Sequence, residues 1–211
     1  MKWAVVGLDG AKTEGGAVAL DQDRRVIAVA NWGPKGTLQE QSSLSATVHR
    51  KCIAKRVGKT ALCYEEPVLW NNRNKPMWTV LRSISMAVGV WVCRFPEHSV
   101  AVNATTWRKA FGIRSGKGRE DLKISALAIA RMLVPANHRD QIAAEDPEAL
   151  ALQRAIDERD ANMAEAYLIA LFAYDKMKLG GRSAEYQFDP FKCLKPKTYK
   201  RRKKNATRKK S

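Results

Sequence analysis

Three short apolar segments within the first 32 residues constrain the fold of this chain most strongly. They cover residues 3–9, 15–20 and 25–32, and Gly, Asp or charged residues separate each segment from the next. Apolar runs of this length with such punctuation are typical of β-strands joined by tight turns. The start of the sequence therefore predicts a three-stranded antiparallel meander.

The sequence after this meander alternates between helical and strand-like patterns. Long stretches with apolar residues at helical spacing are separated by short, continuous apolar runs. The predicted elements are a helix over 38–57, a strand over 60–64, a helix over 75–95, a strand over 98–102 and helices over 105–111, 121–134 and 147–177. We expect the last helix to be broken near Asp160. This order predicts an α/β fold with a mixed five-stranded sheet, three antiparallel strands first, flanked by helices.

The charge of the chain points to a polyanionic partner. Among 211 residues, 38 Lys and Arg outnumber 21 Asp and Glu, which gives a formal net charge of +17. From Lys192 to the end there are 11 basic residues and no acidic one. We therefore expect one domain over 1–180 and a basic, disordered tail over 181–211. Non-specific binding to nucleic acid phosphates is the favoured role of this tail, and a solubilising or localising role is the alternative.

Other residue types exclude several classes of protein. The 4 cysteines form no CxxC pair and the 3 histidines stand far apart, so neither a zinc site nor a disulfide framework is indicated. No segment has the length and apolar character of a signal peptide or a membrane span. We expect a soluble protein of the cytoplasm or nucleoid with no membrane partner.

Four carboxylates stand at positions where they could converge. Asp9 ends the first predicted strand and Glu65 ends the fourth, while Asp160 and Glu165 precede a strongly apolar run in the last helix. Taken alone, Asp9 is equally compatible with a hairpin turn and Glu65 with an exposed strand end. Together the four acids indicate a site for hard divalent cations, because Mg²⁺ and Mn²⁺ prefer oxygen ligands and two-metal phosphodiester hydrolysis needs several carboxylates.

Several phrases in order along the chain resemble the RuvC-type Holliday junction resolvases of the RNase H-like superfamily. The segment GLDGAKTEGGAVAL resembles their first motif, and YEEP resembles their second, with a Glu at the end of the central strand. VNATTWRK followed by Lys123 is similar to their segment leading to a basic residue beside the active site, and DANMAEAYLIA is similar to their last acidic motif. The resemblance covers residues 1 to about 175, and no single motif carries it alone.

One position departs from the bacterial RuvC pattern. In that pattern the last two acids are three residues apart, and the first of them would be Asn162 here. The sequence is more similar to a branch known from phages and plant organelles, in which Asp160 and Glu165 would form the pair. Because residues five apart on a helix point about 140° away from each other, both can face the metals only if Asp160 lies at or before the helix start. Asp157 is the alternative third ligand.

The resemblance implies a structure-selective endonuclease that resolves four-way DNA junctions with paired, symmetric nicks. Asp9, Glu65, Asp160 and Glu165 would hold two Mg²⁺ ions, which Mn²⁺ could replace, and Lys123 would act beside them. The approximate two-fold symmetry of the junction predicts a homodimer, and the apolar helix over 75–95, with Trp78 and Trp91, is a candidate for the dimer contact or for the core. The candidate DNA-binding residues are Asn72, Arg73, Lys75, Trp107, Lys117, Lys200, Arg201, Arg202, Lys203 and Lys204.

Three other functions remain open at this stage. An RNase H acting on RNA/DNA hybrids uses a similar fold and metal site. A non-enzymatic nucleic-acid-binding protein would explain the basic charge, although it gains nothing from carboxylates near phosphate. An actin-like sugar kinase would fit the first Asp-Gly segment, but the chain is too short for two lobes and lacks a second glycine-rich phosphate loop.

Overall fold

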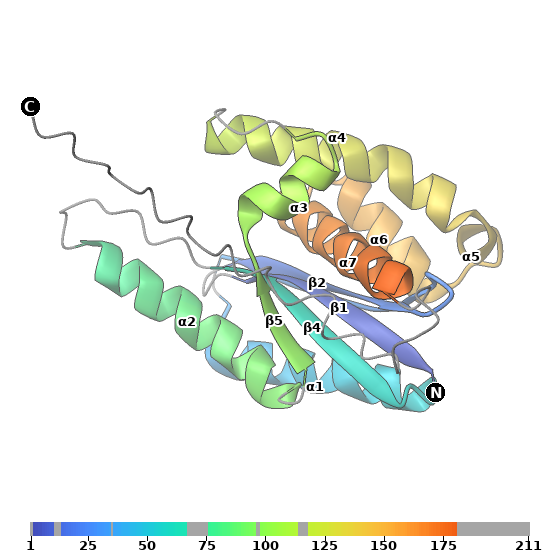
Figure 1. Ribbon diagram of the computed structural model, residues 1–211, viewed down its shortest axis with the longest axis horizontal. Coiled ribbons are helices and arrows are strands. Elements are labelled where there is room, and N and C mark those ends of the chain that lie inside the picture. Colours follow the sequence, from blue (N-terminus) through green and yellow to red (C-terminus); the bar gives the residue numbers. More distant parts are fainter. Residues whose placement is uncertain are drawn as a thin grey trace, which may run out of the picture.

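The computed structural model describes residues 2–10, 14–34, 36–66, 76–95, 98–113 and 118–180 of the chain. Five strands and the helices around them form a single α/β unit (Figure 1). In chain order the elements are β1 (Trp3–Gly10), β2 (Gly15–Asp21), β3 (Val26–Trp32), α1 (Leu38–Ala54), β4 (Lys59–Glu65), α2 (Pro76–Arg94), β5 (Ser99–Val102), α3 (Ala104–Ala110), α4 (Arg119–Asn137), α5 (Arg139–Ala143), α6 (Pro147–Asp157) and α7 (Ala161–Gly180).

The strands form one mixed sheet in the order β3-β2-β1-β4-β5. β1 pairs antiparallel with β2, and β2 pairs antiparallel with β3, as the short apolar segments predict. β4 lies parallel to β1, and β5 lies parallel to β4. The predicted α/β class and mixed five-stranded sheet, with three antiparallel strands first, are confirmed.

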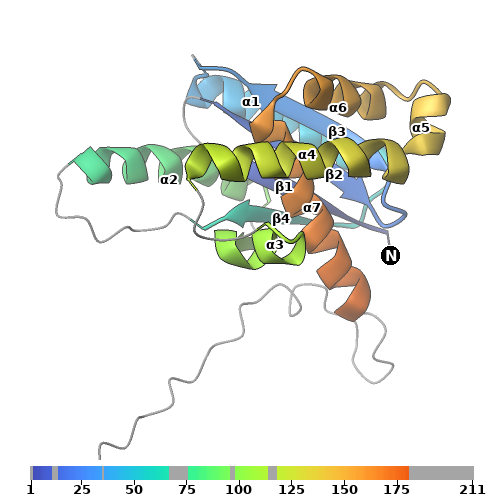
Figure 2. The same ribbon diagram turned by 90° about the horizontal axis from the view of Figure 1, so that it is seen from above.

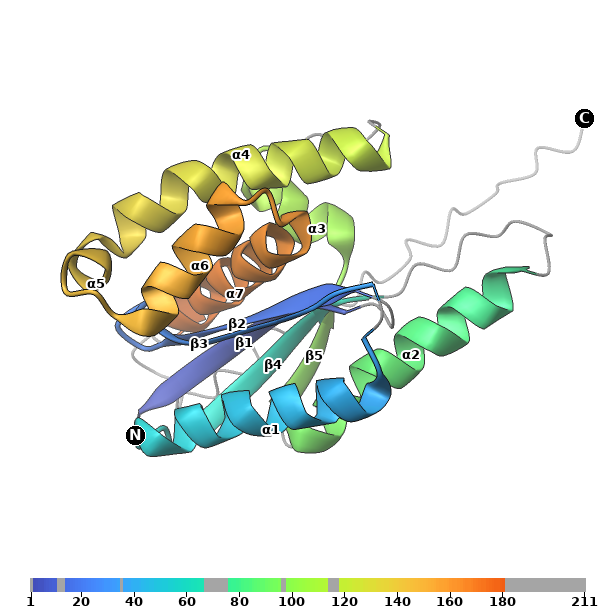
Figure 3. The ribbon, with the colours of Figure 1, turned by 180° about the vertical axis from the view of Figure 1, so that it is seen from behind.

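Helices cover both faces of the sheet (Figures 1 and 3). α1 and α2 pack on one face, where Val48, Cys52 and Trp91 meet the side chains of β1 and β2. α3, α4, α6 and α7 pack on the other, and α4 crosses over α7 (Figure 2). α7 lies closest to the sheet because the residues from Ala166 to Tyr174 are apolar on all sides, so this part of the helix is buried between β1 and α4.

The predicted break near Asp160 is present, because α6 ends at Asp157 and α7 begins at Ala161. The short helix α5 has no counterpart in the sequence analysis, since five residues between two longer helices show no resolvable periodicity. Trp91 is fully buried and stacks on Trp32, with ring centroids 5.8 Å apart, so this tryptophan belongs to the core rather than to a dimer contact. The side chain of Trp78 lies outside the described part of the chain.

Two side chains from the helices cover the outer edge of β3. Gln141 of α5 accepts a hydrogen bond from the backbone N–H of Val26 and donates one to its carbonyl oxygen, at 2.9 and 3.0 Å. Glu148 of α6 accepts the N–H of Val29 at 2.9 Å and also forms an ion pair with Lys51 of α1. These bonds replace part of the missing neighbouring strand and tie both helical layers to this edge.

Within the described residues, no helix is long and apolar enough to cross a lipid bilayer.

Candidate active site

The register of the two central strands places two of the predicted acids side by side. β1 and β4 run parallel, and Leu8 pairs with Tyr64. Asp9 and Glu65 are therefore the next residues on adjacent strands, at the same end of the sheet. This juxtaposition follows from topology, since β1 and β4 are both central and point the same way.

Strand alternation also puts both acids on the face that α7 covers. Val5 and Cys63 pack into the core beneath α7, and Asp9 and Glu65 are even numbers of residues further along the same strands. Glu66 follows the end of β4 and is exposed. The geometry therefore favours Glu65 over its neighbour, in agreement with the sequence interpretation.

Glycines in the β1–β2 hairpin let α7 approach the sheet closely. A Cβ atom on Gly7 would lie 2.2 Å from the carbonyl oxygen of Ala166, and one on Gly16 would lie 2.7 Å from the sulfur of Met163. Only glycine fits at position 7, where the clash is with backbone, whereas at position 16 the flexible Met163 side chain would have to move. Because Gly16 pairs with Asp9, this close packing brings the start of α7 and Glu165 next to the strand ends.

Arg108 of α3 joins the acids from the strand and the helix. Its Nη2 donates to Oε2 of Glu65 at 3.2 Å and to Oε1 of Glu165 at 2.9 Å. Trp107, the residue before it, donates its indole N–H to the same Oε2 of Glu65 at 3.1 Å. The Glu165 side chain is only 6% exposed, so this bridge holds a buried carboxylate in place.

The acids at this end of the sheet disturb one another strongly. Burial raises the pKa of Asp9 well above its ordinary value, and the nearby charges of Glu165 and Glu65 raise this pKa further. Lys123 and Arg108 act in the opposite direction but do not cancel the shift. Perturbed titratable groups that gather at strand ends are a feature of functional sites.

Glu65 shows a smaller shift with the same causes. Burial raises its pKa first, and Glu165 adds to the rise, while Arg108 and the hydrogen bond from Trp107 lower it. The charges of Asp9, Glu65 and Glu165 therefore influence one another. Lys123 and Arg108 are the cations whose charges lower the pKa of Asp9.

Lys123 of α4 reaches this cluster from above the sheet. Its Nζ donates to Oδ1 of Asn162 at 3.0 Å, and its charge lowers the pKa of Asp9. Asn162 is the residue that stands where the bacterial RuvC pattern has an acid. An amide oxygen here holds the lysine without adding a further negative charge to the cluster.

Asp160 lies one residue before α7, which meets the geometric condition set by its spacing from Glu165. Its Oδ1 accepts the backbone N–H groups of Asn162 and Met163, both at 3.0 Å, so Asp160 is the N-cap of the helix. Asp157, the alternative ligand, is exposed at the end of α6 and accepts a hydrogen bond from Gln153. Asp160 accordingly caps the helix that carries Glu165.

The sequence analysis did not single out Arg108, and it named Trp107 only as a candidate for DNA binding. Trp107 is fully buried and stacks under Arg108, whose guanidinium carbon lies 4.9 Å from the ring centroid. Its indole N–H donates to Glu65, so the ring helps to position this carboxylate. All nine other predicted DNA-binding residues lie outside the described part of the chain, namely Asn72, Arg73, Lys75, Lys117, Lys200, Arg201, Arg202, Lys203 and Lys204.

The donor set suits a hard divalent cation. It consists of carboxylate oxygens, the ligands that Mg²⁺ and Mn²⁺ prefer. Burial first, and then the charges of Glu165 and Glu65, raise the pKa of Asp9 despite the opposing charges of Lys123 and Arg108. In the described residues no three His, Cys, Asp or Glu side chains are close enough to enclose a metal ion. The cation between Glu65 and Glu165 is instead the guanidinium of Arg108.

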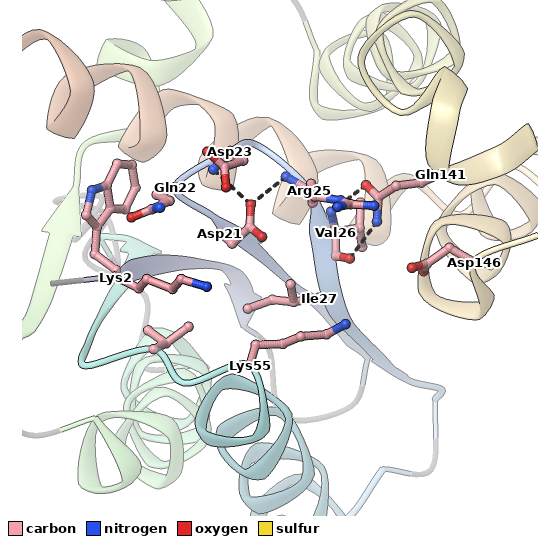
Figure 4. Close-up of a pocket in the computed structure, with 12 residues that line it drawn as sticks. Lys2, Asp21, Gln22, Asp23, Arg25, Val26, Ile27, Lys55, Gln141 and Asp146 are labelled. Atoms are coloured by element: carbon pink, nitrogen blue, oxygen red, sulfur yellow. Dashed lines mark hydrogen bonds between the residues drawn. The ribbon is translucent and has the colours of Figure 1, made fainter. Parts of the chain in front are cut away.

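A cavity of about 240 Å³ lies at the opposite end of the sheet (Figure 4). Asp21 pairs with Ala4 near the start of β1, and Asp21, Arg25 and Lys55 help to line this cavity. Asp21 accepts hydrogen bonds from the backbone N–H groups of Asp23 and Arg25, which closes the β2–β3 turn. Asp21 therefore stabilises the local backbone. The cavity that it lines is separate from the carboxylate cluster.

No model of a known protein family matches the chain, and no curated protein sequence matches it significantly. Among solved structures, RuvC of Thermus thermophilus is similar with a TM-score of 0.50 and 16% sequence identity. The match covers 84% of this chain and 96% of that one. T. thermophilus RuvC in complex with a Holliday junction substrate gives a TM-score of 0.48 and 14% identity at the same coverage. The first similarity establishes a fold like that of RuvC, in agreement with the mixed five-stranded sheet described above.

Proposed function

We propose that this protein is a metal-dependent endodeoxyribonuclease that resolves four-way DNA junctions. The observation that carries the proposal is the convergence of Asp9, Glu65 and Glu165 at one end of a RuvC-like sheet, with two cations among them. Carboxylates so placed repel DNA unless a metal is bound, so a protein that only binds nucleic acid has no use for them. A net charge of +17 supports a nucleic acid substrate.

Asp9, Glu65 and Glu165 would hold the divalent ions, Mg²⁺ or Mn²⁺, with Asp160 as the fourth acid. The ions, two per site, would activate a water molecule and neutralise charge on the scissile phosphate. Asp160 can take part because both of its recorded hydrogen bonds use Oδ1. Trp107 fixes the side chain of Glu65, and Asn162 holds Lys123, which stabilises the charge that develops on the phosphate.

Resolution of a junction requires two opposed cuts, and each described chain offers one carboxylate cluster. A homodimer with two-fold symmetry would place one site on each cut strand and leave 5′-phosphates and 3′-hydroxyls. Met86 of α2 is 45% exposed, which leaves part of this helix available for the contact between subunits.

The decisive experiment is incubation of the full chain with a four-way junction, an RNA/DNA hybrid and a linear duplex, with Mg²⁺ or EDTA. Paired nicks at symmetric positions in the junction, seen only with metal, are the expected result. Preferential cleavage of the RNA strand in the hybrid would indicate an RNase H instead. Binding to all three substrates without any cleavage would indicate a nucleic-acid-binding protein.

Light scattering of the free protein and of its junction complex tests the dimer. A protein that is monomeric in both states, or that nicks only one strand, would contradict the resolvase proposal.

A further inference from the structure

Arg108 occupies an unusual position for a basic residue near a site of this kind. It is only 18% exposed on its side chain, and a single nitrogen, Nη2, bridges Glu65 and Glu165. Both bridged oxygens are donors that a divalent ion would use. Metal and guanidinium therefore compete for the same carboxylate oxygens.

The bonding of Arg108 leaves part of its guanidinium unused. Its Nε is buried and has no hydrogen-bond partner among the described residues. A guanidinium that serves as a permanent structural bridge normally uses its planar fork on two acceptor atoms of one group. Here one nitrogen contacts two different carboxylates, and the guanidinium carbon lies 4.9 Å from the centroid of the Trp107 ring.

Binding of divalent ions would change the sign of the net charge in the cluster. Three carboxylates, Asp9, Glu65 and Glu165, face two cations, Arg108 and Lys123. Without metal, Arg108 offsets repulsion between acids whose burial is costly. With divalent ions bound, the same guanidinium would meet surplus positive charge, and the phosphate of the substrate becomes its best available anion.

We propose that Arg108 is an exchangeable counter-ion: it bridges Glu65 and Glu165 in the metal-free protein, and it releases them to metal and pairs with the substrate phosphate. This inference rests on the proposed function for the phosphate step alone. The metal step concerns only the chain and the ion. Arg108 thus weakens metal binding and promotes cleavage. A single substitution of Arg108 should therefore increase the affinity for metal and lower the cleavage rate.

Equilibrium binding of Mn²⁺ to the full-length, metal-free protein tests the first role without any turnover. Titration calorimetry, or the electron paramagnetic resonance signal of free Mn²⁺, gives the affinity for wild type, Arg108→Gln and Lys109→Gln. Lys109 is the matched control because it is exposed on the same helix and loses the same charge. We expect Arg108→Gln to bind Mn²⁺ about tenfold more tightly and Lys109→Gln to stay within about twofold of wild type.

Arg108→Lys keeps the charge but cannot offer a planar fork, so an intermediate gain of about threefold is expected. This variant also decides the question if Arg108→Gln does not fold, which thermal melting would reveal. Unchanged or weaker Mn²⁺ binding in the folded Arg108 variants would overturn the proposal, because it would make Arg108 a fixed organiser of the site.

Cleavage of a four-way junction at saturating Mn²⁺ tests the second role. Arg108→Gln should lower kcat by about 100-fold although it binds metal more tightly. Wild-type kcat in this variant would overturn the phosphate step. Tighter Mn²⁺ binding in Arg108→Gln, together with no cleavage of any DNA by wild type, would refute the proposed function and leave the counter-ion role intact.

Discussion

Carboxylates gather at both ends of the central sheet, and the two ends use them in opposite ways. At one end Asp21 closes a turn by accepting two backbone N–H groups, beside an open cavity with exposed cations. At the other end Asp9 and Glu65 lie under α7, where burial and the charge of Glu165 raise their pKa values. An acid that is bonded to local backbone stabilises the fold, whereas acids that are buried together store repulsion that a cation can relieve.

The largest expected difference between the two ends of the sheet is in the cleavage rate after an acid is replaced by its amide. Asp9→Asn, Glu65→Gln and Glu165→Gln should each lower junction cleavage by about 1,000-fold or more, because each removes a metal ligand. Asp21→Asn at the other end should stay within about twofold, because an amide oxygen still accepts both N–H bonds. Rates of nicking on a labelled junction in Mg²⁺ provide the measurement.

DNA binding of these variants should change little, since the basic surface is intact. Glu66→Gln is the control closest to the site, because Glu66 is exposed and adjacent in sequence. Loss of activity in Glu66→Gln with retention in Glu65→Gln would reverse the assignment of the strand end.

Two acids that cap helices, Asp160 and Asp146, provide a second comparison, with a smaller expected effect on cleavage. Asp160 caps α7 and Asp146 caps α6 with the same pattern, since each accepts the N–H groups two and three residues ahead. Asn is an equally good N-cap, so neither Asp160→Asn nor Asp146→Asn should shift the melting temperature by more than about 2 °C. Asp160→Asn alone should lower cleavage, by about 100-fold, if its carboxylate completes the metal site.

The outcome separates two roles that a single substitution would confuse. Wild-type cleavage in Asp160→Asn would leave Asp160 as a cap and remove it from the site. Asp157→Asn, tested beside it, then shows whether the alternative acid takes part.

Lysines at the two ends should differ by a smaller factor. Asn162 holds Lys123 beside Asp9. The substitution Lys123→Gln should lower kcat by about tenfold, because the lysine stabilises charge on the phosphate. Lys55 is exposed beside the cavity, and Lys55→Gln should leave kcat unchanged. Equal effects of the two substitutions would mean that Lys123 contributes only general positive charge.

The smallest expected effect is on stability and depends on pH. The folded pKa of Asp9 is raised above its unfolded value, so ionisation at higher pH destabilises the metal-free protein, and this cost disappears below the ordinary pKa of an Asp. Asp9→Asn should therefore raise the melting temperature in EDTA at about pH 8 by roughly 2–4 °C, the shift that about 1 kcal/mol produces in a chain of this size. The gain should shrink as the pH falls towards about 4.

Asp21→Asn is the comparison for this experiment, and no such gain is expected from it. A melting temperature of Asp9→Asn equal to that of wild type at every pH would mean that Arg108 and Lys123 already balance the cluster.

Much of this arrangement could be predicted from sequence because it is local. Short continuous apolar runs predict β1 and β4, and the acid at the end of each run points to Asp9 and Glu65. The break before α7 follows from Asp160, a residue type that favours helix N-termini. The parallel pairing of β1 with β4 then brings the acids together without any further information.

The contributions of α3 could not be predicted in the same way. Arg108 is one of 38 basic residues, and the two acids that it bridges lie 43 and 57 residues away in sequence. Trp107 reads equally well as a surface aromatic or a buried one, and the packing of α3 on α7 decides between them. Such contacts depend on how helices dock on the sheet, and short helices carry little periodic signal.

The covered edge of β3 has a consequence for how these molecules behave together. An open strand edge is a template on which neighbouring chains can add strands, the first step towards aggregates and fibrils. Gln141 and Glu148 already occupy the N–H groups of Val26 and Val29, and the opposite edge strand, β5, is only 4 residues long. Side chains thus occupy part of one edge of the sheet and the other edge is short, and both features hinder the addition of a strand from a neighbouring chain.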